Sequence, residues 1–220
     1  MQRAVVTSQR PTVLLTGFGA FPGIAANATE TLVPQLAAAA RERFPDYDIV
    51  DAVLPVDWNR APELLQSLLS ANAPRLALHF GISQGAEDFR IERVSRNVCE
   101  PRHDACGALP AEVAVVKSGA DTLSTTLPIE RIVERLKAIG VPCCTSDDAG
   151  AYLCNALLYH SLAAASTQAR PHIAGFVHIP AALAAGACDP AEIVECRLTW
   201  PTAVAGGLEI IATCLEDAPA

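Results

Sequence analysis

Aromatic and basic residues are both scarce in this chain. Phe, Trp and Tyr make up 5% of its 220 residues, and 16 Lys and Arg stand against 24 Asp and Glu, for a formal net charge of -8. Surfaces that bind nucleic acid or anionic membranes need clustered Lys and Arg, and single-stranded nucleic acid also needs aromatic rings for stacking. The composition therefore argues against nucleic acid and membranes as partners.

Long apolar runs and a leader peptide are also missing from the sequence. No apolar run reaches the roughly 18 residues that a membrane span requires. The segment Met1–Pro11 has no apolar core followed by a small-residue cleavage site. We therefore predict a cytoplasmic protein without a secretory signal, in which residues 1–11 form a flexible N-terminal extension.

Cysteine is plentiful, but no CxxC pair is present. In a chain of this length without a secretory signal, thiols are expected to stay reduced, and a structural zinc site has little support. We predict free thiols and no metal. The eight cysteines are Cys99, Cys106, Cys143, Cys144, Cys154, Cys188, Cys196 and Cys214.

Apolar residues make up 51% of the chain, which is enough for a sizeable buried core. Strand-like and helix-like segments alternate, and neither a repeat nor a linker interrupts them. This alternation predicts a single α/β domain over residues 1–220, with a mainly parallel twisted sheet flanked by helices on both faces. The expected strands are 12–16, 49–56, 75–81, 141–146 and 172–180, and the expected helices are 29–44, 62–69, 127–139, 150–165 and 203–215.

Loops that follow parallel strands are the expected place for a functional site, because the carboxyl ends of such strands share one edge of the sheet. Three such loops, 17–23, 81–97 and 146–154, carry unusual residues. In the last, a small polar turn precedes Cys154, which falls in or near the first turn of the helix 150–165. Free N–H groups and the helix dipole favour a thiolate there. Cys154 is a candidate nucleophile, with a buried structural thiol as the alternative.

A cysteine nucleophile needs a base, and His178 is the best placed of the five histidines. It stands near the end of an apolar strand, directly before Ile179-Pro180. Glu92 is a candidate for a carboxylate that orients His178 and stabilises its imidazolium. On the residues alone, a core histidine and an ordinary surface ion pair remain alternatives for these two side chains.

Four motifs, in this order along the chain, resemble the pyroglutamyl peptidase type I family. Residues 16–23 look like its opening loop, and residues 81–97 look like its glutamate motif. Residues 146–155 are similar to its cysteine motif, and residues 175–180 are similar to its histidine motif. The spacing between Cys154 and His178 also agrees with the family pattern, and the resemblance runs from Val13 to about Leu215.

The resemblance implies a cysteine exopeptidase that removes N-terminal pyroglutamate from peptides, needs no cofactor and assembles as a homotetramer. Cys154 would attack the carbonyl, His178 would transfer the proton, and Glu92 would orient His178. Arg102 matches the family's arginine near the oxyanion, with a solvated loop charge as the alternative. The implied substrate-binding residues are Phe18, Phe21, Asn27, Ile82, His103 and Leu153.

The chain departs from the family pattern along one wall of the implied pocket. Ile82 stands where Gln is common, Ala86 where Arg is common, and His103 where an aliphatic residue is common. Two rival functions stay open: a cysteine amidase for another N-capped or cyclic amide, and a binding protein that has lost turnover. A nucleotide-handling enzyme is disfavoured, because the glycines of loop 17–23 fit neither the P-loop nor the dinucleotide fingerprint.

Overall fold

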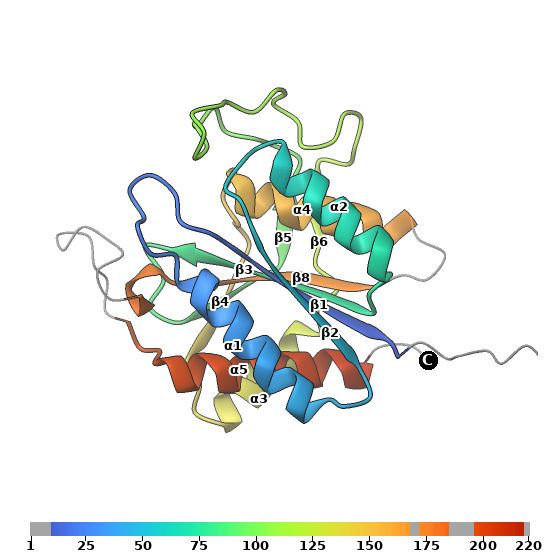
Figure 1. The fold of residues 1–220 in the computed structure, drawn as a ribbon, viewed down its shortest axis with the longest axis vertical. Coiled ribbons are helices and arrows are strands. Elements are labelled where there is room, and N and C mark those ends of the chain that lie inside the picture. Colours follow the sequence, from blue (N-terminus) through green and yellow to red (C-terminus); the bar gives the residue numbers. More distant parts are fainter. Residues whose placement is uncertain (1–9, 168–171, 185–195, 218–220) are drawn as a thin grey trace, which may run out of the picture.

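A six-stranded sheet runs through the middle of the molecule, with helices packed on both of its faces (Figure 1). The computed structural model describes residues 10–167, 172–184 and 196–217. The predicted α/β class is confirmed. Of the extension expected at 1–11, residues 1–9 lie outside the described residues, and so does Cys188. None of the described helices is long and apolar enough to cross a membrane.

The strands follow the order β2-β1-β3-β8-β4-β7, and the sheet is mixed. Four neighbouring strands are parallel to one another, and the last two run the opposite way. The parallel strands are β1 (Thr12–Phe18), β2 (Asp48–Leu54), β3 (Leu76–Ser83) and β8 (Ile173–Pro180). The reversed strands are β4 (Phe89–Glu92) and β7 (Cys143–Ser146), and β5 (Val94–Arg96) pairs separately with β6 (Thr122–Ser124).

The direction of β7 corrects the premise that all three loops leave from one edge of the sheet. Because β4 is antiparallel to β8, and β7 is parallel to β4, the loop after Ser146 leaves toward the opposite edge. The chain then returns, so that the Cys154 thiol lies beside Gly81, which is paired with His178. The site therefore forms beside the sheet face and not only at the strand ends.

In the described part of the chain five helices are present, and they lie on the two faces of the sheet (Figure 1). One face carries α1 (Ala28–Arg43), α3 (Ile129–Ala138) and α5 (Trp200–Asp217), and the other carries α2 (Arg60–Asn72) and α4 (Leu153–Thr167). A short 3-10 turn, η1 (Ala181–Leu183), follows β8. Each face buries its own apolar cluster, so the sheet is apolar on both sides, as expected of a sheet covered by helices.

Local chemistry explains where two of these helices begin. The side chain of Asn27 accepts a hydrogen bond from the backbone N–H of Thr29, which caps α1. Helix α4 begins at Leu153 and not at the expected 150, because Gly150 has a φ of +79°, outside the helical region. Cys154 is consequently the second residue of α4 and lies in its first turn, which agrees with the prediction that it falls in or near that turn.

Candidate active site

The nucleophile candidate is held by a tight turn at the start of α4. The Ser146 hydroxyl accepts a hydrogen bond from the Asp148 N–H at 3.1 Å, and the Asp148 carboxylate accepts one from the Gly150 N–H at 2.9 Å. Side chains that bond to the backbone two residues on stabilise such turns. Asp148 is in turn bound to Arg96 at 2.6 Å. The turn therefore presents Cys154 on the first turn of a helix, where N–H groups are free of helical partners.

Gly81 makes room for the thiol of Cys154. A Cβ atom at position 81 would lie 2.8 Å from the Cys154 Sγ and 2.7 Å from the ring of Phe176. Both distances are well below van der Waals contact, so a larger residue would displace the sulfur. The glycine that the sequence showed at the end of a predicted strand has a steric reason: it lets the helix start approach the sheet.

His178 and Glu92 form a buried pair on neighbouring strands. The His178 Nδ1 lies 2.8 Å from the Glu92 Oε1, and both side chains are buried. Burial by itself acts to lower the pKa of His178, but the charge and hydrogen bond of Cys154, followed by those of Glu92, raise it to about 9. The pair therefore favours an imidazolium between a sulfur and a carboxylate, which is the charge distribution of an activated cysteine.

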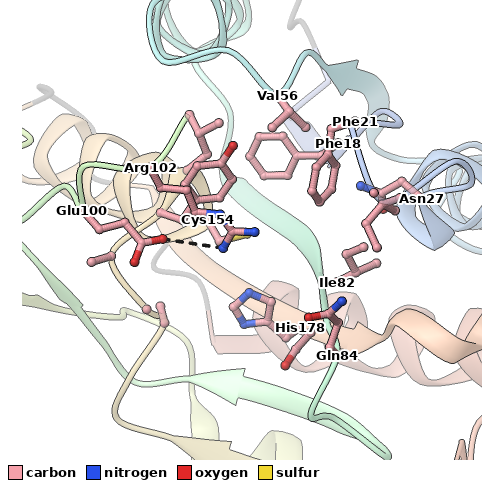
Figure 2. Close-up of a pocket in the computed structure, with 18 of the residues that line it drawn as sticks. Phe18, Phe21, Asn27, Val56, Ile82, Gln84, Glu100, Arg102, Cys154 and His178 are labelled. Carbon is pink, nitrogen blue, oxygen red and sulfur yellow. Dashed lines mark ion pairs between the residues drawn. The ribbon is translucent and has the colours of Figure 1, made fainter. Parts of the chain in front are cut away.

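A cavity of about 510 Å³ opens beside Cys154 and His178 (Figure 2). Its apolar side is formed by two phenylalanines, one at the end of β1 and one in the loop that follows it. Aliphatic residues from that loop, β3, the start of α4 and the segment after β2 complete this side. These apolar residues are Phe18, Phe21, Ile24, Val56, Ile82 and Leu153. The sequence predictions for Phe18, Phe21, Ile82 and Leu153 thus fall on one cavity, as the family resemblance implied.

Asn27 also lines the cavity, but its amide is largely occupied. The Nδ2 donates to the Gly19 carbonyl at 3.0 Å, and the Oδ1 accepts from the Thr29 N–H at 3.1 Å. The side chain is buried. Asn27 therefore holds the loop that carries Phe18 and Phe21, and one N–H of its amide is left for a ligand.

Arg102 reaches the cavity from the long segment between β5 and β6. Its guanidinium lies over the ring of Tyr152 at 4.6 Å and 3.7 Å from the Glu100 carboxylate (Figure 2). The backbone carbonyl of Arg102 accepts a hydrogen bond from the Trp58 indole at 2.9 Å. The side chain remains 60% exposed, so the arginine is placed near Cys154 by few contacts.

His103 is not among the residues that line the cavity. Its ring Nδ1 lies 2.9 Å from the Gly107 carbonyl, and the side chain is exposed. The short loop 99–107 turns back on itself at this point, and Asp104 braces it by accepting from the N–H groups of Trp58, Cys106 and Ala108. The structure therefore gives His103 a role in the loop and places Tyr152 beside Arg102 instead.

Sequence reasoning missed several residues that complete the site. Gln84, Arg90 and Glu100 line the cavity. Asn155 is fully buried, and its amide bonds the Arg96 and Val98 carbonyls as well as the Arg96 N–H. A polar residue directly after the nucleophile, on the inner side of an apolar helix, was the available signal for Asn155. Its partners are more than 50 residues away in sequence, so the contact itself could not be predicted from the sequence.

An arrangement of thiol, imidazole and carboxylate beside an apolar cavity is characteristic of hydrolases that use a cysteine nucleophile. No group of three or more His, Cys, Asp or Glu side chains suited to a metal ion occurs in the described part of the chain. The fold and the site together define the class as a hydrolase that has an α/β fold and uses a cysteine nucleophile.

Comparisons with known proteins identify the family. Residues 11–212 match the family model of pyroglutamyl peptidase. The chain is 35% identical over 214 residues to pyrrolidone-carboxylate peptidase 1 of Ralstonia nicotianae, covering 94% of each protein. It is 34% identical over 169 residues to the pyrrolidone-carboxylate peptidase of Pyrococcus furiosus, covering 76% of this chain and 80% of that one.

The solved structures agree with the sequence relatives. A mutant pyrrolidone carboxyl peptidase from Pyrococcus furiosus superimposes with a TM-score of 0.83 at 28% identity, covering 94% of this chain and 100% of that chain. This chain belongs to the pyroglutamyl peptidase family.

Proposed function

We propose that this protein removes N-terminal pyroglutamate from peptides, with Cys154 as the nucleophile. The observation that carries the proposal is the Cys154–His178–Glu92 arrangement beside an apolar cavity. Family membership and the activity named for the curated relatives support the same reaction.

The chemistry proceeds by acyl transfer. The Cys154 sulfur attacks the carbonyl carbon that follows the pyroglutamyl ring, and the carbonyl electrons move onto oxygen. When the tetrahedral intermediate collapses, the C–N bond breaks and the His178 imidazolium gives its proton to the leaving amine. Water then attacks the thioester, with His178 taking its proton, and pyroglutamate is released. Glu92 stabilises the imidazolium form through its bond to Nδ1.

The developing oxyanion has two sources of stabilisation. The free N–H groups at the start of α4 carry partial positive charge, and they lie near the substrate carbonyl that Cys154 attacks. The Arg102 guanidinium approaches from the opposite wall. Because its side chain is 60% exposed, solvent screens its charge, and we assign it a supporting role.

The apolar side of the cavity fits a neutral lactam ring. Phe18 and Phe21 offer flat faces, and Ile82 and Leu153 complete an apolar wall. A charged side chain would lose its hydration there without gaining a partner, which costs several kcal/mol. We therefore expect the cavity to select pyroglutamate over glutamate or an N-terminal residue with a free ammonium.

A direct test uses pyroglutamyl-aminocoumarin and its prolyl analogue as substrates. We expect release of the fluorophore from the pyroglutamyl compound and almost none from the prolyl one. Cys154→Ser should abolish release, whereas Cys106→Ser, an exposed thiol outside the cavity lining, should leave it intact. Release that persists in Cys154→Ser would refute the mechanism.

The two rival functions give different results in the same experiment. A cysteine amidase for another cyclic amide would leave the pyroglutamyl compound uncleaved while still reacting selectively with iodoacetamide at Cys154. A binding protein that has lost turnover would show no preferred labelling of Cys154 over the other thiols. Mass mapping of the labelled protein separates these outcomes.

We also infer a homotetramer in the cytoplasm, as the family resemblance implied. Exposed apolar residues on the segment between β5 and β6, with Leu109 at 49% and Val113 at 74% exposure, are suited to a contact between subunits. Light scattering coupled to size-exclusion chromatography tests the assembly: a mass of one chain would contradict it.

A further inference from the structure

One row of side chains crosses the sheet beneath the active site. Gly81 of β3 is paired with His178 of β8, and His178 is paired with Arg90 of β4. On the other side of β3, His79 is paired with Thr16 of β1. Because these two strands are parallel, Phe18 of β1 and Gly81 of β3, each two residues further on, also lie side by side. Paired residues of neighbouring strands point to the same face. We call Phe18, Gly81, His178 and Arg90 the active-site row.

The active-site row fixes the direction in which a substrate lies. Phe18 belongs to the apolar wall for the ring, and the His178 imidazole must reach the leaving amine. The scissile bond therefore lies between them, above Gly81, where Cys154 stands. The next strand after His178 is β4, about 4.8 Å further on. One extended residue spans roughly 3.3–3.6 Å. The residue that follows pyroglutamate must therefore extend over Arg90.

Arg90 presents a positive charge at this place. It lines the cavity, and its Nη2 donates to the Gly85 carbonyl at 2.9 Å, which leaves other N–H groups of the guanidinium unused. Among the described residues, no ion pair joins Arg90 to a carboxylate. The thiol of Cys144, its neighbour on β7, is its other contact.

The other charges around the cavity are already matched. Asp148 is bound to Arg96 at 2.6 Å, and Glu100 lies 3.7 Å from Arg102. Beyond the cavity, the Asp88 carboxylate accepts from Arg197 at 2.9 Å and from the Cys144 thiol at 3.2 Å. Arg90 is thus the charge on the leaving-group side that a substrate would meet without a competing partner.

We propose that Arg90 is a specificity-determining residue, and that the enzyme prefers pyroglutamyl peptides with Asp or Glu directly after the pyroglutamate. The proposal rests on the proposed function, because it places the leaving peptide by the acyl-transfer geometry. A partly exposed ion pair between Arg90 and a substrate carboxylate would contribute at most about 1 kcal/mol to binding. We therefore expect kcat/KM to favour pyroglutamyl-Asp over pyroglutamyl-Asn peptides of otherwise equal sequence by about three- to fivefold at low salt.

The test measures the Asp/Asn ratio of kcat/KM by chromatography of the released amine. In Arg90→Gln the ratio should fall to about one, and in Arg90→Lys part of it should remain. Arg41→Gln removes an equal charge from the distant pair with Asp51 and should keep the full ratio. A ratio near one in the wild-type enzyme, or one that survives in Arg90→Gln, would overturn the proposal.

A second measurement needs no variant. Raising the salt concentration from about 0.02 M to about 0.5 M shortens the screening length and should reduce the wild-type Asp/Asn ratio toward one. A ratio that is independent of salt would contradict a charge interaction with Arg90. If neither peptide is cleaved, the proposed function itself fails, whereas cleavage of both without a preference overturns only the role of Arg90.

Discussion

The two walls of the active site differ in how firmly they are held. The inner wall is the sheet, where Glu92 and His178 are buried on adjacent strands and Gly81 admits the Cys154 thiol. The outer wall is the segment between β5 and β6, where Arg102 is 60% exposed and Val113 is 74% exposed. His178 and Glu92 are thus held by paired strands, whereas Arg102, the residue proposed to stabilise the oxyanion, lies on a loop.

The residues that depart from the family pattern were expected along one wall of the pocket, but the structure places them on both walls. His103 lies on the outer wall, outside the cavity lining, and its ring serves the loop. Ile82 lies at the cavity but as part of β3, where an apolar side chain maintains the ring wall. We expect substitutions at these places to affect recognition more than the chemistry, because strand pairing holds His178 and Glu92 independently of them.

The inner wall should be the more sensitive to small steric changes. In Gly81→Ala, the added methyl would meet the Cys154 sulfur and the Phe176 ring at less than 3 Å. A nucleophile displaced by about 1 Å loses roughly 100-fold in kcat. Steady-state kinetics and a melting curve measure the effect. Gly85→Ala, where a Cβ meets nothing within 4 Å, is the matched control and should retain full activity.

Glu92→Gln should lower activity and change its pH dependence. We expect a loss of roughly 10- to 100-fold, because Glu92 supports the imidazolium but does not touch the substrate. Cys154 and Glu92 raise the pKa of His178 to about 9 against the effect of burial. The imidazolium is present below that pH and lost above it, so the alkaline limb of kcat/KM should fall near pH 9. In Glu92→Gln that limb should move to lower pH, and an unmoved limb would contradict the role of Glu92.

Asn155→Ala should couple stability to activity. It removes the side-chain hydrogen bonds to Ser95, Arg96 and Val98, and the Arg96 and Val98 backbone groups, which are partly buried in these bonds, lose their side-chain partner. We expect a loss of about 2–3 kcal/mol in the free energy of unfolding and a lower kcat, since the bonds join the nucleophile helix to the strand that follows Glu92. Denaturant titration and kinetics test both effects. Asn72→Ala, which removes a single bond to Leu68 at the end of α2, should cost less than about 1 kcal/mol.

Arg102→Ala should have the smallest effect on turnover. If the exposed guanidinium stabilises the oxyanion alongside the N–H groups of α4, as proposed, its loss should lower kcat by about tenfold. Arg102→Lys should restore part of it. If kcat is unchanged in Arg102→Ala, the alternative that Arg102 is a solvated loop charge is correct, and the outer wall takes no part in the chemistry.

Local signals made two residues of the site candidates, and the family resemblance supplied the rest. Cys154 follows a polar turn at a helix start, and His178 stands near the end of an apolar strand, whereas the pocket roles of Phe18 and Phe21 were implied by the resemblance. The fold class followed from the alternation of apolar patterns. The position of β4 was not readable, because four residues in a strand give too little periodicity to fix a direction.

The amino-acid sequence by itself determined the chemical groups, the α/β class and the order of the motifs along the chain. Only the tertiary structure decided which groups meet. Arg90 and Gln84 look like ordinary polar residues in sequence, yet both line the cavity. The reversed β4 places Glu92 at 2.8 Å from His178 and Arg90 beside it in register. These contacts join residues 86 and 88 positions apart, and strand pairing across such separations is set by the packing of the whole sheet, not by any local pattern.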